Sequence, residues 1–353
     1  MLYSLQYLRF VAALYVALFH FREIFGQYGG GQKLVNVFSF GYVGVDIFFV
    51  MAGFIMVFIT GFRGSAMQFA TNRLTRIYSG YWPVFLFFLA YKWVFSDINR
   101  YIPNGLSMLD SAFLTSYDSR VLLIYPTWSL MYEIFFYLMF AILLALRYVT
   151  PAFLMGIGLL LMEAHFQVLD PFWHWFLLNP IQIEFALGIL LGVVYRNQDI
   201  STRIFRISIC MTIFLYAVGV YIGIENGFRE MAIWDRVMFF GGGSFFLIYT
   251  LLYLEQHGAM PFSRQLKVLG DASYAMYLIH APLFYILEDN KVLYGVGTKA
   301  GPYTLLLLVF TVLCILAVAY HLLIELPLYR LGKQKISNWI PLSASSSRVG
   351  WSD

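Results

Sequence analysis

The apolar stretch GYVGVDIFFVMAGFIMVFIT, from Gly41 to Thr60, decides the fold class of this chain. A helix needs about 20 predominantly apolar residues to cross a membrane, and this stretch supplies them. Asp46 is its single charged residue, and an ionised carboxylate inside a membrane is tolerated only where it is partnered or used. The stretch therefore predicts a transmembrane helix that carries a functional carboxylate.

The rest of the 353-residue chain has the same character. Apolar residues make up 61% of it and charged residues 12%, whereas a soluble domain carries about 25% charged residues. This composition predicts an all-α fold, a polytopic transmembrane helix bundle. The net charge of +4 is small and no basic tract occurs, which argues against nucleic acid as a partner.

The hydropathy pattern gives ten candidate membrane spans. They are residues 3–22, 42–60, 78–95, 127–146, 151–163, 180–195, 204–223, 237–254, 273–288 and 302–325. An even number puts both termini on one side. If that side is the cytoplasm, the inner loops and tail hold thirteen Lys and Arg against four acids, and the outer loops hold nine against eleven. The positive-inside rule then predicts an N-in, C-in topology, with a transmembrane domain over 1–330 and a cytoplasmic tail over 331–353.

Arg9 and His20 lie eleven residues apart in the first span. On a helix this is three turns plus roughly 20°, so the two side chains share one face about 16 Å apart. In the predicted topology Arg9 lies toward the cytoplasm and His20 in the outer half. A cation near one side and an imidazole toward the other suit a long anionic donor that reaches through the bilayer.

Three carboxylates are expected at the depth of His20, namely Asp46, Glu133 and Glu184. A histidine beside a carboxylate is the usual general-base arrangement, because the carboxylate fixes the imidazole tautomer and stabilises the imidazolium. We therefore predict that His20 is the base and that Asp46 or Glu133 orients it. The alternative for any single membrane carboxylate is a hydrogen bond between helices.

Arg73 and Arg76 enter the third span from the cytoplasmic side. Positions i and i+3 present both guanidiniums on one helix face, a geometry that suits phosphate oxygens. Anchoring beside lipid headgroups is the alternative, and the deeper Arg9 on the same side favours a ligand site over it. His321 and Glu325, one turn apart in the last span, are interpreted mainly as a structural tie.

Six motifs occur in order along nearly the whole chain. They are Arg9 to His20 (Arg-x10-His), Gly44 to Phe54 (GVDxFFVxSGF), Arg73 to Tyr78 (Arg-x-x-Arg-Ile-Tyr-Pro), Trp128 to Tyr137 (WSLxxExxFY), Gly270 to His280 (GDxSYxxYLxH) and Glu325 to Pro327 (Glu-x-Pro). Together they resemble acyltransferase family 3, the bacterial integral-membrane O-acyltransferases of surface and secreted glycans, in a stand-alone form without a C-terminal SGNH domain. Ala52 departs from the usual Ser and removes a hydroxyl, and Ser79 departs from the frequent Pro.

The resemblance implies a reaction and its site. Cytoplasmic acyl-CoA, expected to be acetyl-CoA, would place its phosphates on Arg9, Arg73 and Arg76 and bring its thioester toward the outer half. There His20, helped by Asp46 or Glu133, would remove the proton from a hydroxyl of a glycan or lipid-linked sugar. Direct transfer and an acyl-imidazole on His20 both stay open, as does a succinyl group in place of acetyl.

Further polar and aromatic side chains are expected to line the substrate path. They are Trp128, Ser129, Glu184, Tyr277 and His280, and a packed polar stripe is the alternative for the last two. The implied location is the bacterial cytoplasmic (inner) membrane, with membrane lipids and a second copy of the chain as further partners.

Two other classes of protein also place charged groups inside a membrane. A transporter or flippase of a lipid-linked sugar would need a polar path, but it would not need an arginine site on one side and a base on the other. A non-catalytic scaffold of a polysaccharide assembly complex would have no reason to hold His20, Asp46 and Glu133 at one depth. No cluster of His, Cys and Glu has the spacing of metal ligands, so no metal is predicted.

Overall fold

The computed structural model describes residues 2–95, 105–115, 122–146, 179–197, 201–228 and 231–339. Within these ranges every regular element is helical, so the predicted all-α class is confirmed for this part of the chain. The candidate span at 151–163 lies outside the described residues.

The described residues form the following helices in chain order. They are α1 (Tyr3–Gln27), α2 (Gln32–Phe38), α3 (Val43–Thr60), α4 (Ala66–Phe95), α5 (Gly105–Phe113), the 3₁₀ turn η3 (Tyr125–Thr127), α6 (Trp128–Leu146), α9 (Gln182–Asn197), α10 (Thr202–Glu225), α11 (Ile233–Asp235), the π-helical η4 (Arg236–Gly241), α12 (Gly242–Gln256), α13 (Arg264–Asp271), α14 (Ser273–Asp289), α15 (Val292–Ala300), α16 (Pro302–Tyr320), the π-helical η5 (His321–Glu325) and α17 (Leu326–Trp339).

Each candidate span within the described ranges coincides with one of these helices. Among the described residues, five helical stretches are long and apolar enough to cross a membrane: Gln32–Thr60, Tyr125–Ala145, Thr202–Glu225, Ile233–Gln256 and Pro302–Ile336. The chain is therefore a multi-pass helical membrane protein, while ten crossings and the N-in, C-in orientation stay predictions. The expected domain boundary at residue 330 falls inside α17.

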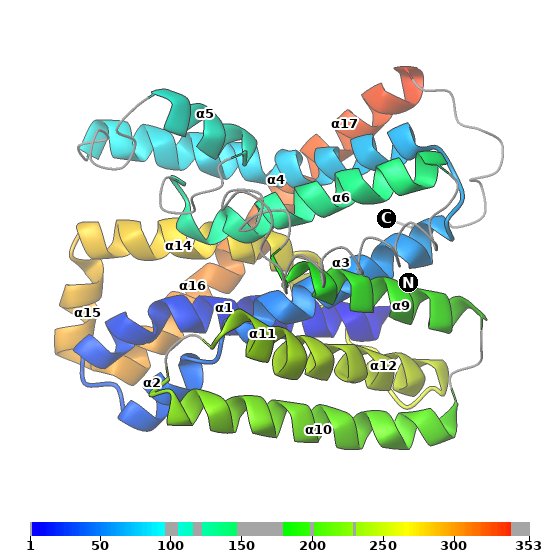
Figure 1. The fold of residues 1–353 in the computed structure, drawn as a ribbon. Helices are drawn as coiled ribbons and strands as arrows, with labels where there is room; N and C mark the ends of the chain where they lie inside the picture. Colours follow the sequence, from blue (N-terminus) through cyan, green and yellow to red (C-terminus); the bar gives the residue numbers. More distant parts are fainter. Residues whose placement is uncertain are drawn as a thin grey trace, which may run out of the picture.

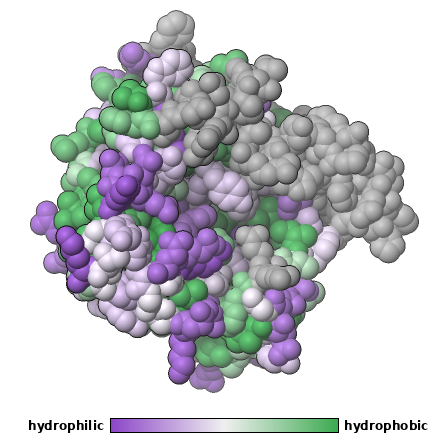
Figure 2. Space-filling view, turned by 90° about the vertical axis from the view of Figure 1, so that its left-hand side faces the viewer, coloured by the Kyte–Doolittle hydropathy of each residue, from purple (hydrophilic) through white to green (hydrophobic). Residues whose placement is uncertain are grey.

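The long helices lie side by side with α1 and α3 in the middle of the bundle (Figure 1). α10 forms one edge, and α4 with α17 lies toward the other. The start of α1 and the end of α17 are at the same end of the bundle. Figure 2 shows the opposite end, where hydrophilic residues gather in several patches.

The outer helices turn apolar side chains outward. On α10, Ile213 and Phe214 are 66% and 57% exposed, and on α16 Leu307 is 69% exposed. A soluble protein rarely leaves large apolar side chains this open along whole helices, whereas a lipid-facing helix requires it. These two helices therefore present the surface that lipid tails contact.

α3 packs so closely against α1 and α9 that the helix backbones approach each other directly. A methyl group added at Gly53 would lie 2.1 Å from the carbonyl oxygen of Phe185 in α9, and one added at Gly188 would lie 2.0 Å from that of Val50 in α3. At Gly44 the same addition would lie 2.4 Å from the carbonyl oxygen of Ala12 in α1. Small residues let membrane helices pack at this distance, because dispersion contacts replace the hydrophobic drive that lipid does not supply.

We expect Gly53→Ala to lower the free energy of unfolding by about 1–3 kcal/mol, the usual cost of overpacking. The added methyl group can be accommodated only if α3 and α9 separate. Gly295→Ala is the matched control, because no atom lies within 4 Å of a methyl group at that helical position. Thermal unfolding of both variants in detergent checks this, and equal midpoints would show that the α3–α9 contact does not limit stability.

Candidate functional site

Arg9 and His20 both belong to α1, an unbroken helix of 25 residues. The predicted separation of about 16 Å along one helix face therefore holds in the structure. Both side chains are partly exposed although the helix lies in the middle of the bundle. α1 thus joins two regions of polar side chains, which are described in turn.

The first region is an arginine cluster, defined here as Arg9, Arg73 and Arg76 with Glu133 and Glu325. Arg9 interacts electrostatically with Arg76, Glu325 and Glu133. Glu133 interacts in turn with all three guanidiniums. Side chains from α1, α4, α6 and η5 therefore converge, and the predicted grouping of the three arginines is found in the structure.

The arginines of this cluster differ in how fully they are engaged. Arg76 forms an ion pair with the buried Glu325, whose other oxygen lies 2.9 Å from His321 Nδ1. Its guanidinium also lies 5.7 Å from the ring centres of both Tyr274 and Tyr329. The side chain of Arg76 nevertheless stays 26% exposed, so a ligand can reach it.

Arg73 and Arg9 keep more of their N–H groups available. Arg73 stacks 5.4 Å from the ring centre of Tyr137 and 5.7 Å from that of Phe69. Arg9 donates a long hydrogen bond, 3.4 Å from its Nη1 to Oε1 of Gln6. These two guanidiniums are therefore the better placed to take up a new anionic partner.

Glu133 accepts a hydrogen bond from the hydroxyl of Tyr137 within the arginine cluster. This position corrects the expectation that Glu133 lies beside His20. Counting residues from the predicted membrane surface gave it the depth of His20, but the side chain leaves α6 on the face turned to α4 and lies near Arg9, three turns from His20.

Asp46 belongs to a second group of charges, here called the outer carboxyl cluster and consisting of Asp46, Glu184 and Arg236. Arg236 donates from Nε to Oδ1 of Asp46 at 2.8 Å and from Nη2 to Oδ2 at 3.2 Å. Asp46 and Glu184 are 0% exposed. Glu184 lies close to both Asp46 and Arg236 and interacts electrostatically with each, so this cluster holds two carboxyl groups and one guanidinium.

The bidentate pair corrects the expectation that Asp46 orients His20. Within the described ranges no hydrogen bond or ion pair connects His20 to Asp46 or Glu133. Asp46 faces η4 and α9, whereas His20 faces α14. Equal depth in the membrane did not imply contact, because helix rotation decides which neighbour a side chain meets.

The group that does face His20 is His280 of α14. Their ring centres are 5.2 Å apart, with 36° between the ring planes. The ring of Tyr277 lies 5.7 Å from that of His280, and its hydroxyl is 2.7 Å from Ser129 Oγ at the start of α6. The predicted lining residues of α6 and α14 are thus brought together beside His20.

Trp128, the residue before Ser129, has ring contacts with Phe49 and Tyr132, at 6.5 and 6.0 Å between ring centres. Glu184, by contrast, lies in the outer carboxyl cluster, as described above. Among the described residues no group of three or more His, Cys, Asp and Glu could hold a metal ion.

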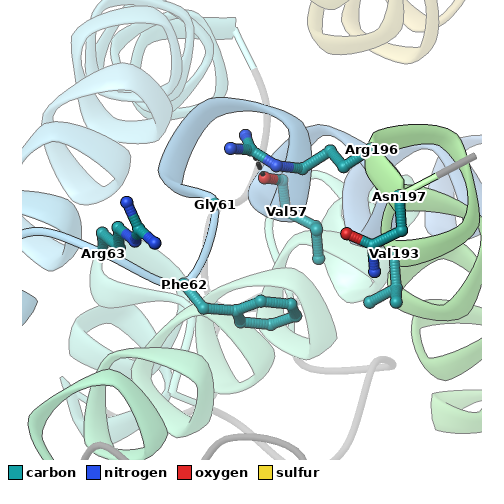
Figure 3. Close-up of a pocket in the computed structure, with 7 residues that line it drawn as sticks. All are labelled: Val57, Gly61, Phe62, Arg63, Val193, Arg196 and Asn197. Carbon is teal, nitrogen blue, oxygen red and sulfur yellow. Dashed lines mark hydrogen bonds between the residues drawn. The ribbon is translucent and has the colours of Figure 1, made fainter.

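A cavity of about 220 Å³ lies where α3 and α9 end (Figure 3). Arg196 lies beside it and donates to the carbonyl oxygen of Phe58 at 3.1 Å. Gly61, in the left-handed conformation at φ 53°, leaves room for that guanidinium. Since a helix C-terminus carries partial negative charge, Arg196 serves as a cap for α3, and we do not assign the cavity to the chemistry.

Two contacts are not predicted from the sequence. Arg236 directly precedes the candidate span 237–254, so it is one of the nine Lys and Arg that the predicted topology places in the outer loops. His280 was placed on the substrate path without a partner. For Arg236 a signal existed in the buried Asp46, which demanded a cation that no nearby residue supplied.

Comparison with known proteins identifies the family of this chain. Residues 2–320 match the family model described as an acyltransferase domain, acyltransferase family 3. The chain is 25% identical over 315 residues to the exopolysaccharide production protein ExoZ of Rhizobium meliloti (strain 1021), covering 86% of this chain and 94% of that protein. No solved structure matches. Because the family model covers nearly all of the chain, the protein belongs to acyltransferase family 3 and is an acyltransferase.

Proposed function

We propose that the protein is a membrane O-acyltransferase that moves an acyl group from cytoplasmic acyl-CoA to a hydroxyl of an exopolysaccharide or other surface glycan. The main support for this proposal is that one helix, α1, carries both Arg9 and His20. Arg9 lies in a cluster of three arginines, and His20 lies against a buried histidine. A phosphate-binding end and a base end on one rigid helix are what a long, phosphate-bearing donor requires.

The arginine cluster is the proposed donor end. Phosphate oxygens match the planar guanidinium fork, and Arg9 and Arg73 have N–H groups left to offer. In our proposal Glu133 keeps these guanidiniums together while the site is empty, so its role is to position them.

His20 is the proposed base at the other end. Its ring takes the proton from the acceptor hydroxyl as the hydroxyl oxygen attacks the thioester carbonyl carbon. The carbon–sulfur bond then breaks, and the leaving thiolate of CoA receives the proton from His20, so that ester and free CoA are the products. A positioned base of this kind contributes about 10²- to 10⁴-fold.

The proposed acceptor rests on the similarity of this chain to ExoZ of Rhizobium meliloti (strain 1021). Its name connects it with exopolysaccharide production, and we propose the same class of acceptor for this chain. We further propose an acetyl group, a location in the bacterial inner membrane with N-in, C-in topology, and a homo-oligomer in contact with membrane lipids.

Membranes containing the protein, incubated with labelled acetyl-CoA and the native glycan, provide the test. The proposal predicts base-labile label on the glycan. Glycan export without label transfer would instead identify a transporter of a lipid-linked sugar.

In this assay we expect His20→Ala to reduce label transfer by about 10²- to 10⁴-fold, because the hydroxyl loses its proton acceptor. Donor binding, measured on the purified variant, should stay near that of the unmodified protein. Turnover close to the unmodified rate would remove His20 from the mechanism.

Arg73→Ala should weaken acyl-CoA binding by roughly 10- to 100-fold, the range for losing one charge-assisted hydrogen bond. Its thermal midpoint should change little, because Arg73 forms ring contacts rather than a direct ion pair. Arg76→Ala should lower the midpoint as well, because it leaves Glu325 buried without its cation. Calorimetric titration with acyl-CoA measures the affinity of both variants, and thermal unfolding measures their midpoints. The exposed Arg206→Ala is the control for general charge loss. Unchanged affinity in both variants would place the donor elsewhere.

Arg236→Gln should destabilise the protein by about 3–5 kcal/mol, because it leaves a buried carboxylate without its cation. Asp46→Asn should cost less, because Glu184 lies beside Arg236 and can serve as its counter-charge. The double variant should lose clearly less than the sum of the two, a coupling that thermal unfolding can measure. If Asp46 acts directly on the substrate instead, Asp46→Asn would lose activity with an unchanged unfolding midpoint.

A further inference from the structure

His280 occupies an unusual position for a polar side chain. It is 0% exposed, and neither of its ring nitrogens has a hydrogen-bond partner within the described part of the chain. Burying an unsatisfied polar group costs about 1–3 kcal/mol, so such a group calls for a functional reason.

The neighbours of His280 leave His20 as its polar partner. Tyr277 is already engaged, since its hydroxyl bonds to Ser129 and to the carbonyl oxygen of Pro126. Phe284 covers another side with its ring centre 6.0 Å away. Among charged groups, Arg22 interacts electrostatically with His20 from the same helix.

The ring of His280 also has polar backbone neighbours. The carbonyl groups of Met276 and Tyr277, on its own helix, interact with its ring, although no contact reaches full hydrogen-bond geometry. A neutral imidazole carries its proton on one nitrogen only. The other nitrogen then keeps a lone pair that can accept a hydrogen bond.

We propose that His280 is a positioning residue for His20, holding its ring and accepting a hydrogen bond from the imidazolium that forms during acyl transfer. This inference rests on the proposed function. A carboxylate usually has this role, but Asp46 and Glu133 are engaged elsewhere in this chain. A neutral imidazole performs it without adding a second buried charge.

The present spacing of the rings is compatible with this role. Ring centres 5.2 Å apart allow a hydrogen bond between two imidazole nitrogens that point at each other. Within the described part of the chain neither nitrogen of His280 has such a partner, so the His20 ring must turn to form the bond. His20 is partly exposed and has room to turn, whereas His280 is enclosed. Catalytic hydrogen bonds are often long before the substrate binds and tighten in the complex.

Two variants of nearly equal size separate positioning from packing. Asn keeps a hydrogen-bond acceptor at position 280 and Leu does not. We expect His280→Leu to lower kcat by about 10- to 100-fold with little change in KM for acyl-CoA, because the arginine cluster is untouched. His280→Asn should recover a substantial part of that loss. Steady-state label transfer with the purified protein measures both, and His257→Leu, at a histidine stacked on Tyr253, should keep full kcat.

Equal kcat for the Leu and Asn variants would overturn the inference, and so would a loss confined to KM. These results are distinguishable from failure of the proposed function. If His20→Ala keeps its turnover, the base assignment itself fails. If His20→Ala is inactive while His280→Leu has normal kcat, only the positioning role is wrong.

Discussion

The close passage of α3 between α1 and α9 is the constraint on which the rest of this structure depends. Gly44 lets α3 lie against the backbone of α1, and Gly53 and Gly188 do the same against α9. Lipid tails are as apolar as the helix surfaces, so close packing and buried polar contacts hold such a bundle together. Asp46, one turn into α3, is thereby held at a fixed height next to η4, where Arg236 meets it.

Each charged group inside the bundle lies close to others that balance or use it. Asp46 has Arg236, and Glu325 has both Arg76 and His321. In the arginine cluster three guanidiniums lie close to Glu133 and Glu325, and Asp271 also interacts electrostatically with Arg9. The histidine pair is surrounded by rings, hydroxyls and the guanidinium of Arg22, which interacts electrostatically with His20. The two regions therefore differ in kind, one suited to anions and the other to moving a proton.

Helical periodicity within single segments is enough to predict several of these side-chain relations. The face shared by Arg9 and His20, the Arg73–Arg76 pair and the His321–Glu325 tie all follow from helix geometry within one segment. Contacts between segments could not be obtained in this way. Asp46 and Arg236 are 190 positions apart, and the partner of His20 belongs to α14. Depth in the membrane can be read from residue counts, but the rotation of each helix about its axis is set by packing, which is why Glu133 was expected beside the wrong residue.

The continuity of α1 gives the enzyme a molecular ruler. Under the proposed route, the span from phosphate to thioester is measured by the helix rise between Arg9 and His20, which the unbroken hydrogen-bond ladder keeps constant. An acyl donor with a shorter chain between its phosphate and its thioester would not bring the reactive carbonyl to the imidazole, however tightly its phosphates bind. The length of the transferred acyl group, by contrast, is not measured by this ruler. Under this route, selection of the donor and selection of the acyl chain are therefore physically separate tasks.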